Sequence, residues 1–486
     1  MKKYIIPLAF VGALSFTSCS KDNFDPDVNQ YLTDERRQEL NKNPEIATKL
    51  IQGELNGIYD NNIDAEESDV FGLKSIHLAT DLSGLDMVLA SWHWFGYDYY
   101  WNSRKADYPR PAFTWQFLYK QISAINKVFV SYFAEVPTDE RLFQKYAELK
   151  SLRAVYYYYL VNLFQFSYKG NEDKLGVPLV LKPSDTHLPR ATVAQVYDQI
   201  LADFAVVDDP RFKTTSLKTD VDKTVAAAFL AKVYAHREEW DKVAQYAQVV
   251  MQTEGVDYTS LADVQAGKWD ISMTSWLWGY NITQQTTSQW SSFYSNIDNT
   301  IGGYAGGSGA YKNIYSLLYN QIPDSDVRKQ IYANTTLFPD IANRYEFPDY
   351  VSLKYATDDR FLGDYCFIRV EDPFLLYVEA LVEQNKLGEA KTALESFVQQ
   401  YRDPSYTLSA TTQAAMREEV RFQRRVELWG EGTSFFDFKR WHLGADRTAA
   451  GSNHVFKVDT PANSSNWVYQ IPKSEMESNP NMQQNP

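Results

Sequence analysis

The sequence predicts a mainly α-helical protein. A tetratricopeptide-like helical-repeat scaffold carries a large, irregular, loop-rich insertion lobe that contains a few short strands. Long segments place apolar residues at helical spacing, and two of them share one helix–turn–helix plan. The segments between them are rich in Trp, Tyr, Asn, Ser and Gly, with only short alternating runs. We therefore expect helical repeats separated by insertions rather than a continuous solenoid.

Helical periodicity covers five stretches of the chain. They are residues 113–133, 140–164, 192–207, 223–251 and 374–400. Thr192 is expected to cap the third helix. In 223–251 a polar break precedes Trp240, and in 374–400 Leu387 takes the place of that tryptophan. These two stretches therefore predict two matching helix pairs.

Two aromatic runs in the insertions have strand-like alternation. In SWLWGYNIT every second residue from Trp276 to Ile282 falls on one face of a strand. The run SWHWFGYDYYWN, residues 91–102, also alternates but changes phase at Gly96. A glycine suits a bulge or a turn at that point.

The N-terminus has the features of a lipoprotein signal peptide. Lys2 and Lys3 precede a short apolar stretch, and LSFTSC then leads into Cys19. The apolar stretch is shorter than the roughly 20 residues that a membrane-spanning helix needs. We predict cleavage before Cys19 and lipidation of that residue, with an ordinary secretory signal as the alternative.

The predicted domain organisation has three parts. Residues 1–18 form the signal peptide, 19–35 a lipidated flexible tether, and 36–486 a single body. The scaffold of the body is drawn from about 36–60, 113–252 and 366–441, and the lobe from about 61–112, 253–365 and 442–486.

The charge of the chain limits its partners. The 486 residues carry a net charge of −14, and removal of residues 1–18, with two Lys and no acid, changes it to −16. The negative net charge argues against binding of nucleic acid or of an anionic lipid surface. Cys366 is the other cysteine besides Cys19, so we expect no intramolecular disulfide in the body.

Motifs for catalysis or metal binding are missing from the sequence. The six His form no HExxH and no other pair at metal spacing. GGYAGGSGA, residues 302–310, lacks the last Gly of GxSxG and the GK[ST] of a phosphate loop. A pair of glycosidase carboxylates cannot be recognised in a sequence, so an enzyme stays an open alternative. We expect no catalytic residue, no metal and no cofactor.

Four stretches carry a resemblance to a known family. They are the signal with its acidic tether, AELKSLRAVYYYYLVNLFQ with GVPLV after it, the matching helix pairs, and RRVELWGEGTSFFDFKRW at 424–441. With them the chain resembles the SusD/RagB-type nutrient-uptake lipoproteins of the Bacteroidetes outer membrane. The last stretch is similar to RRxELxxEGxRxxDLxRW, from which Ser434 and Phe438 depart. We expect its charged residues to form structural ion pairs: Arg424, Arg425, Glu427, Glu431 and Asp437.

The resemblance implies a binding protein. It implies that the chain binds an oligosaccharide or polysaccharide at the cell surface and delivers it to a SusC-like, TonB-dependent transporter of the outer membrane. The same role for peptides is the main alternative, and a glycan-degrading enzyme is a third.

The distribution of tryptophan favours a glycan. Seven of the 12 Trp lie in 92–101 and 269–290, and sugar rings stack on the faces of Trp and Tyr. The expected first wall consists of Trp92, Trp94, Tyr97, Tyr99 and Trp101, with Asn102 as a hydrogen-bonding partner. The expected second wall consists of Trp276, Trp290 and Tyr294, with Trp278 in the core.

Overall fold

The computed structural model describes residues 42–357 and 361–485. The predicted signal peptide, Cys19, the tether at 19–35 and the start of the predicted scaffold at 36 lie outside the described residues. The described chain is mainly helical with short strands, which confirms the predicted fold class. None of its described helices is both long and apolar enough to cross a membrane.

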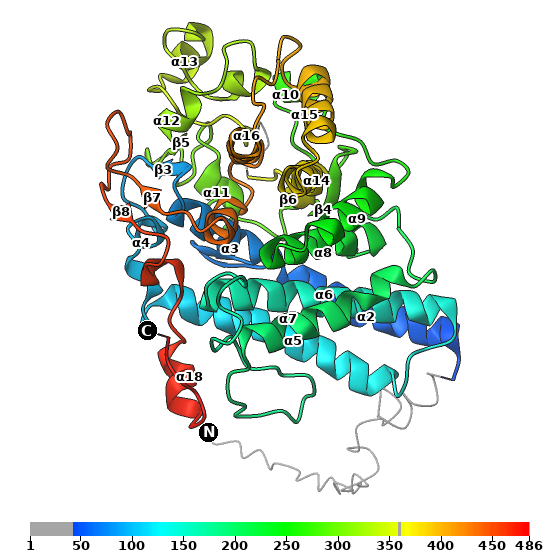
Figure 1. Cartoon of the computed structure of the whole chain (residues 1–486). Coiled ribbons are helices and arrows are strands. Elements are labelled where there is room, and N and C mark those ends of the chain that lie inside the picture. The colour runs from blue at the N-terminus through cyan, green and yellow to red at the C-terminus, as the bar shows by residue number, and fades with distance from the viewer. Residues whose placement is uncertain (1–41, 358–360, 486) are drawn as a thin grey trace, which may run out of the picture.

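Four long helices form a layer at one end of the molecule (Figure 1). They are α2 (Pro44–Asn61), α5 (Pro109–Tyr132), α6 (Glu140–Phe164) and α7 (Val193–Phe204). Helix α6 coincides with the predicted range and packs against the other three helices. Its C-terminal half is almost entirely buried. A helix covered on all sides is apolar all round, which accounts for the continuous run at its end.

The tyrosine run of α6 reaches four separate parts of the fold. Successive side chains on a helix point about 100° apart, so neighbouring tyrosines meet different partners. Tyr156 donates to Asn62 (3.1 Å), Tyr157 donates to the carbonyl of Val180 (2.8 Å), and Tyr158 and Tyr159 pair with His236 (3.1 Å) and His77 (2.9 Å). Buried phenol hydroxyls need such partners, so this run joins elements that are distant in sequence.

The repeat helices form a second group. They are α8 (Lys223–Arg237), α9 (Trp240–Met251), α14 (Glu371–Glu383), α15 (Leu387–Tyr401) and α16 (Gln413–Glu427). Helix α9 packs between α8 and α14, and α14 also contacts α15 and α16. The two predicted helix pairs are therefore confirmed. Thr192 also caps α7 as predicted, because its hydroxyl accepts from the backbone N–H of Gln195 at 3.2 Å.

Short elements make up the lobe and the connections. The helices are α3 (Leu73–Ser83), α4 (Gly96–Tyr99), α10 (Leu261–Gln265), α11 (Phe293–Ile297), α12 (Ser316–Tyr319), α13 (Pro339–Tyr345), α17 (Ser434–Arg440) and α18 (Lys473–Ser478), with 3₁₀ turns η3 (Asn102–Arg104), η4 (Ala205–Asp208), η5 (Val327–Ile331) and η6 (Ser465–Trp467). Antiparallel strand pairs are β1 (Ala65–Glu67) with β2 (Val70–Phe71), β3 (Met87–Leu89) with β5 (Lys312–Ile314), β4 (Trp276–Tyr280) with β6 (Tyr365–Arg369), and β7 (Ala445–Asp446) with β8 (Asp459–Thr460).

The predicted strand in SWLWGYNIT exists, but it ends earlier than expected. Strand β4 covers Trp276–Tyr280, and all five of its residues are buried. The alternation of residues along this strand therefore does not distinguish a face that packs in the core from a face that is open to solvent. The partner β6 and the surrounding aromatic rings cover both sides of the strand.

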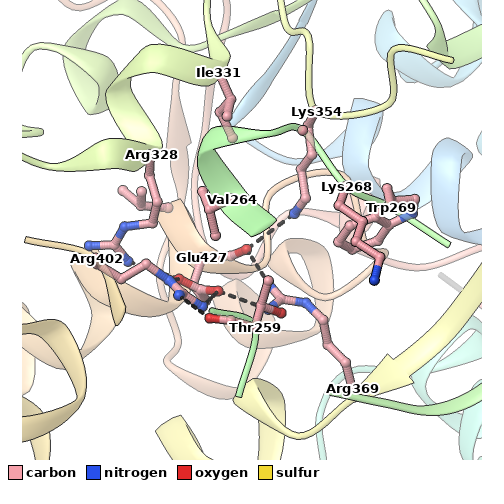
Figure 2. A pocket seen from close by; sticks show the side chains of 12 residues that line it. Thr259, Val264, Lys268, Trp269, Arg328, Ile331, Lys354, Arg369, Arg402 and Glu427 are labelled. Carbon is pink, nitrogen blue, oxygen red and sulfur yellow. Dashed lines mark hydrogen bonds and ion pairs between the residues drawn. The ribbon is translucent and has the colours of Figure 1, made fainter. Parts of the chain in front are cut away.

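A buried ion network joins the end of α16 to the lobe (Figure 2). The carboxylate of Glu427 accepts from Arg402 at 2.7 Å, from Arg369 at 2.8 Å and from Arg328 at 3.1 Å. Each of these side chains is at most 4% exposed. Arg328 lies in η5 of the lobe, Arg369 ends β6 and Arg402 follows α15, so one carboxylate ties a lobe segment to two other parts of the chain.

The network continues through Glu431, four residues further along. Its carboxylate contacts Arg369 at 2.8 Å and the Lys354 ammonium at 2.5 Å. Burial alone would raise the pKa of Glu427, but Arg402 and Arg369 outweigh it and hold that pKa well below the usual 4.5. The stabilisation by Glu427 is therefore present above about pH 4.5 and is lost as the pH falls through the folded-state pKa.

Removal of the central carboxylate should destabilise the protein strongly. In Glu427→Gln three buried guanidinium groups lose a shared negative partner, which costs about 3–5 kcal/mol of unfolding free energy. Urea and thermal unfolding measure this loss. Glu418→Gln is the matched control, because that carboxylate on the same helix is 69% exposed and its pair with Arg421 contributes about 0–1 kcal/mol. Equal stability of the two variants would contradict the role of the network.

Candidate functional site

The charged pocket beside the network is not a ligand site. Figure 2 shows it lined by Arg328, Lys354, Arg369, Arg402 and Glu427. Its volume is about 50 Å³, whereas ligand pockets measure about 300–1,000 Å³. The side chains of Arg328, Lys354, Arg369 and Arg402 around it already donate to internal carboxylates and carbonyls. This pocket therefore belongs to the structural network.

The aromatic run 91–102 forms a loop and a short helix instead of the predicted strand. Helix α4 begins at Gly96, whose N–H donates to the carbonyl of His93 at 2.6 Å. A Cβ at Gly96 would lie 2.9 Å from the indole of Trp92, so this ring covers the backbone where the chain turns. The predicted change of direction at Gly96 is therefore present. The predicted strand alternation is wrong, because local helical hydrogen bonds replace the sheet ladder.

Four of the nominated aromatic residues are core residues, and the expectation that they stack on a ligand is wrong. They are Tyr99, Trp101, Trp276 and Tyr294, each at most 7% exposed. The Tyr99 hydroxyl pairs with His454 at 2.8 Å, and the Trp101 indole donates to the carbonyl of Ser83 at 2.8 Å. Distant segments close over these rings, and a single sequence does not reveal such contacts. Trp278 is fully buried, as expected.

The other nominated rings gather at the surface. Trp92, Trp94, Tyr97 and Trp290 are 54%, 50%, 43% and 47% exposed. Within the described residues, they are the only Phe, Tyr or Trp side chains that are exposed to this degree. The edge of the Tyr97 ring contacts Trp92 at a centroid distance of 5.0 Å. Asn102 is also exposed, at the start of η3.

Two half-buried tyrosines extend this group of rings. The Tyr108 ring lies 6.1 Å from that of Tyr97. The Tyr304 ring lies 5.0 Å from that of Trp290 and 4.2 Å from that of His93, which sits between Trp92 and Trp94 in sequence. Tyr304 and His93 therefore link Trp290 to the run at 91–102. We call this group the aromatic surface, and it consists of Trp92, Trp94, Tyr97, Tyr108, Trp290 and Tyr304.

A depression of about 510 Å³ opens beside the aromatic surface. It is lined by Trp94, Tyr97, Tyr108, Glu67, Asp69, Asp98, Ser103, Asp107, Pro109 and Arg110. The β1–β2 turn separates the depression from the Trp290 side, because the Ser68 hydroxyl pairs with that of Tyr304 at 3.0 Å. This volume falls within the range of small-molecule sites.

Buried polar pairs support the floor of the depression. The Arg110 guanidinium lies 2.9 Å from the Asp69 carboxylate and 3.2 Å from that of Asp98. Burial alone would lower the pKa of Arg110, but Asp98 and Asp69 outweigh it and raise that pKa. Burial raises the pKa of Asp69 above its usual value despite this contact. The Ser103 hydroxyl donates to Asp98 at 2.7 Å.

The 424–441 motif positions the segment that leads into the aromatic surface. Asp86 precedes β3, which leads to residue 91, and its carboxylate accepts from Arg425 at 2.6 Å and from Ser434 at 2.7 Å. The Trp429 indole donates to the Asp86 carbonyl at 2.8 Å. Ser434 thus contacts a carboxylate that Arg425 already neutralises. Strand β3 in turn pairs with β5, where Leu89 lies opposite Lys312.

The expected ion pairs of this motif are confirmed. Arg424 contacts Asp372 at 2.8 Å and Asp437 at 3.0 Å, and Arg425, Glu427 and Glu431 have the partners given above. Sequence reasoning missed Tyr108, Tyr304, Glu67 and Asp107 as parts of the site. They lie in three separate segments, at 67, 107–108 and 304, and no pattern in the sequence marks them.

Two family models match the chain over overlapping ranges. One, described as the SusD family, matches residues 191–486. The other, described as starch-binding associating with outer membrane, matches residues 31–235. The first range alone is more than half of the chain. The chain belongs to the SusD family. The resemblance carried by 424–441 is thereby confirmed, and the family description associates this SusD-family protein with the outer membrane and with glycan binding.

Solved structures share the fold of this SusD-family protein. A SusD-like carbohydrate-binding protein from Bacteroides vulgatus is 21% identical with a TM-score of 0.78, over 90% of this chain and 97% of that chain. A SusD superfamily protein from Bacteroides thetaiotaomicron is 22% identical with a TM-score of 0.74, over 90% and 99%. Surface glycan-binding protein A from Bacteroides fluxus is 17% identical with a TM-score of 0.68, over 90% and 99%. No curated protein matches the chain.

Truncation of buried and exposed tryptophans should have different effects on stability. Trp101→Ala and Trp276→Ala leave cavities in the core and should cost about 3–5 kcal/mol of unfolding free energy. Trp92→Ala and Trp94→Ala should change it by less than about 1 kcal/mol, because half of each ring already faces water. Urea unfolding of the four variants measures the difference. If Trp94→Ala lowers the unfolding free energy as much as Trp101→Ala does, the exposed rings are structural.

Proposed function

We propose that this SusD-family protein binds an oligosaccharide or polysaccharide on the aromatic surface and delivers it to a TonB-dependent transporter. One observation carries the proposal: among the described residues, the exposed aromatic side chains gather at a single place, beside a depression of ligand size. Large apolar rings are costly to leave in water, and pyranose rings cover them with their C–H faces. The relatives named above as carbohydrate-binding support the same ligand class.

The proposed role is binding without catalysis. Two of the acids at the depression, Asp69 and Asp98, are engaged by Arg110 and so are not a free glycosidase pair. A bound polysaccharide should therefore be recovered with its chain length unchanged after long incubation. Release of new reducing ends would instead favour the enzyme alternative.

Loss of an exposed ring should weaken glycan binding. A screen of neutral and charged polysaccharides and of peptides by isothermal titration calorimetry first identifies the ligand. Trp94→Ala and Trp290→Ala should then each cost about 1–3 kcal/mol, roughly tenfold or more in affinity. Val130→Ala is the matched control, because this exposed aliphatic residue lies near the end of α5 that is remote from the depression. Binding of peptides alone would favour the peptide alternative, and unchanged affinity in both variants would place the site elsewhere.

A lipid at Cys19 is proposed to anchor the protein in the outer membrane, facing the cell surface. The wild-type protein should partition into detergent and take up labelled palmitate, whereas Cys19→Ala should do neither, because cleavage and acylation both need this thiol. Protease treatment of whole cells tests the orientation. An unlabelled, water-soluble wild type would contradict the anchor.

The transporter is proposed to be a SusC-like barrel on which this protein sits as a lid. A lasting assembly needs an interface of about 2,000 Å² or more, and rigid helical repeats present surfaces of that extent. Affinity purification of the tagged protein from native membranes in mild detergent should recover the barrel in equal amount. Repeated recovery of the lipoprotein alone would contradict a stable complex.

A further inference from the structure

The depression beside the aromatic surface has an excess of negative charge. Four carboxylates line it, those of Glu67, Asp69, Asp98 and Asp107, against the single guanidinium of Arg110. The mature chain has the same sign of charge as the depression. A ligand that enters this space therefore meets a negative field at close range.

The positive charge of Arg110 is already used inside the protein. Its Nε donates to Asp98 at 3.2 Å, and its two terminal nitrogens donate to the carbonyl and the carboxylate of Asp69, each at 2.9 Å. The side chain is 3% exposed and its guanidinium lies over the Phe95 ring. It therefore offers a ligand almost no accessible donor.

Two of the carboxylates have no internal partner. Glu67, in β1, and Asp107, just before α5, are exposed. Across residues 42–357 and 361–485 neither of them forms an ion pair or a side-chain hydrogen bond. They come from segments about forty positions apart in sequence and line one depression together with the rings of Trp94, Tyr97 and Tyr108. The charge of this pair is available to a ligand.

The lining combines two preferences that few ligands satisfy together. Aromatic faces take the C–H face of a sugar ring, and they also attract a cation. Free carboxylates favour an ammonium group and repel uronic acids and sulfated sugars. A neutral hexose or an N-acetylated hexosamine meets the first preference and can donate hydrogen bonds to the carboxylates, but it has no positive charge to pair with them.

We propose that the depression is a subsite for a hexosamine unit with a free amino group. The sugar ring lies against Trp94 and Tyr97, and the ammonium group faces Glu67 and Asp107. This assignment rests on the proposed function, since it names the class of glycan that the aromatic surface accepts. Neighbouring sugar units of the same chain extend across the β1–β2 turn toward Trp290.

Isothermal titration calorimetry with three hexasaccharides of equal length tests the subsite. The probes are the hexamers of β-1,4-linked glucosamine, of N-acetylglucosamine and of glucose. The glucosamine hexamer should bind roughly fivefold to tenfold more tightly than the other two at low salt, and added salt should reduce this preference. In the double variant Glu67→Gln/Asp107→Asn the preference should disappear, while binding of the neutral hexamers stays as in wild type.

The controls separate this inference from the proposed function. Asp241→Asn/Glu418→Gln removes the same charge from exposed positions on α9 and α16, and it should keep the preference. A neutral hexamer could instead bind as tightly as the glucosamine hexamer or more tightly, with binding that depends on Trp94. This result would overturn the hexosamine assignment and leave glycan binding intact. Failure of every saccharide to bind would overturn both. Binding of tetralysine without any saccharide would overturn the assignment and favour a cationic peptide.

Discussion

Buried charge at the end of α16 is the constraint on which the arrangement of this protein depends. A carboxylate removed from water has to be paired, and Arg425, Glu427 and Glu431 of the motif find their partners in other parts of the chain. Glu427 and Glu431 engage Arg328 and Lys354 of the lobe, and both also contact Arg369 at the end of β6. An arrangement that leaves one of these buried charges without its partner is costly. The contacts therefore favour one placement of the lobe on the helical scaffold.

The same motif extends to the segment that carries the exposed rings. Arg425, Trp429 and Ser434 all bind Asp86, from which β3 leads into the aromatic run. On the other side, β6 follows Asp364, whose carbonyl accepts from Tyr294 near Trp290. The scaffold thus supports both walls of the aromatic surface through short, buried connections. Rings held on such a support lose little freedom when a ligand binds, and this preorganisation favours affinity.

The sequence predicted the helices well because periodicity reports burial directly. Helix α6 begins and ends where its pattern does, and the two helix pairs have the predicted turns. The aromatic run was harder to predict, since Trp and Tyr serve equally in core and surface. Tyr99 is buried because His454 reaches its hydroxyl, and Tyr97, two residues earlier, faces water. Glu67 and Asp107 come to line one depression only in the folded chain, so this depression had no signal in the sequence.

A crystal structure of the protein with its tightest-binding oligosaccharide tests the aromatic surface most directly as the ligand site. We expect a sugar ring lying flat against Trp94 or Trp290, with neighbouring units in or beside the depression bounded by Glu67 and Asp107. The helical scaffold and the buried ion network should stay in place. An oligosaccharide bound at another face, with the rings of the aromatic surface still open to solvent, would contradict this assignment.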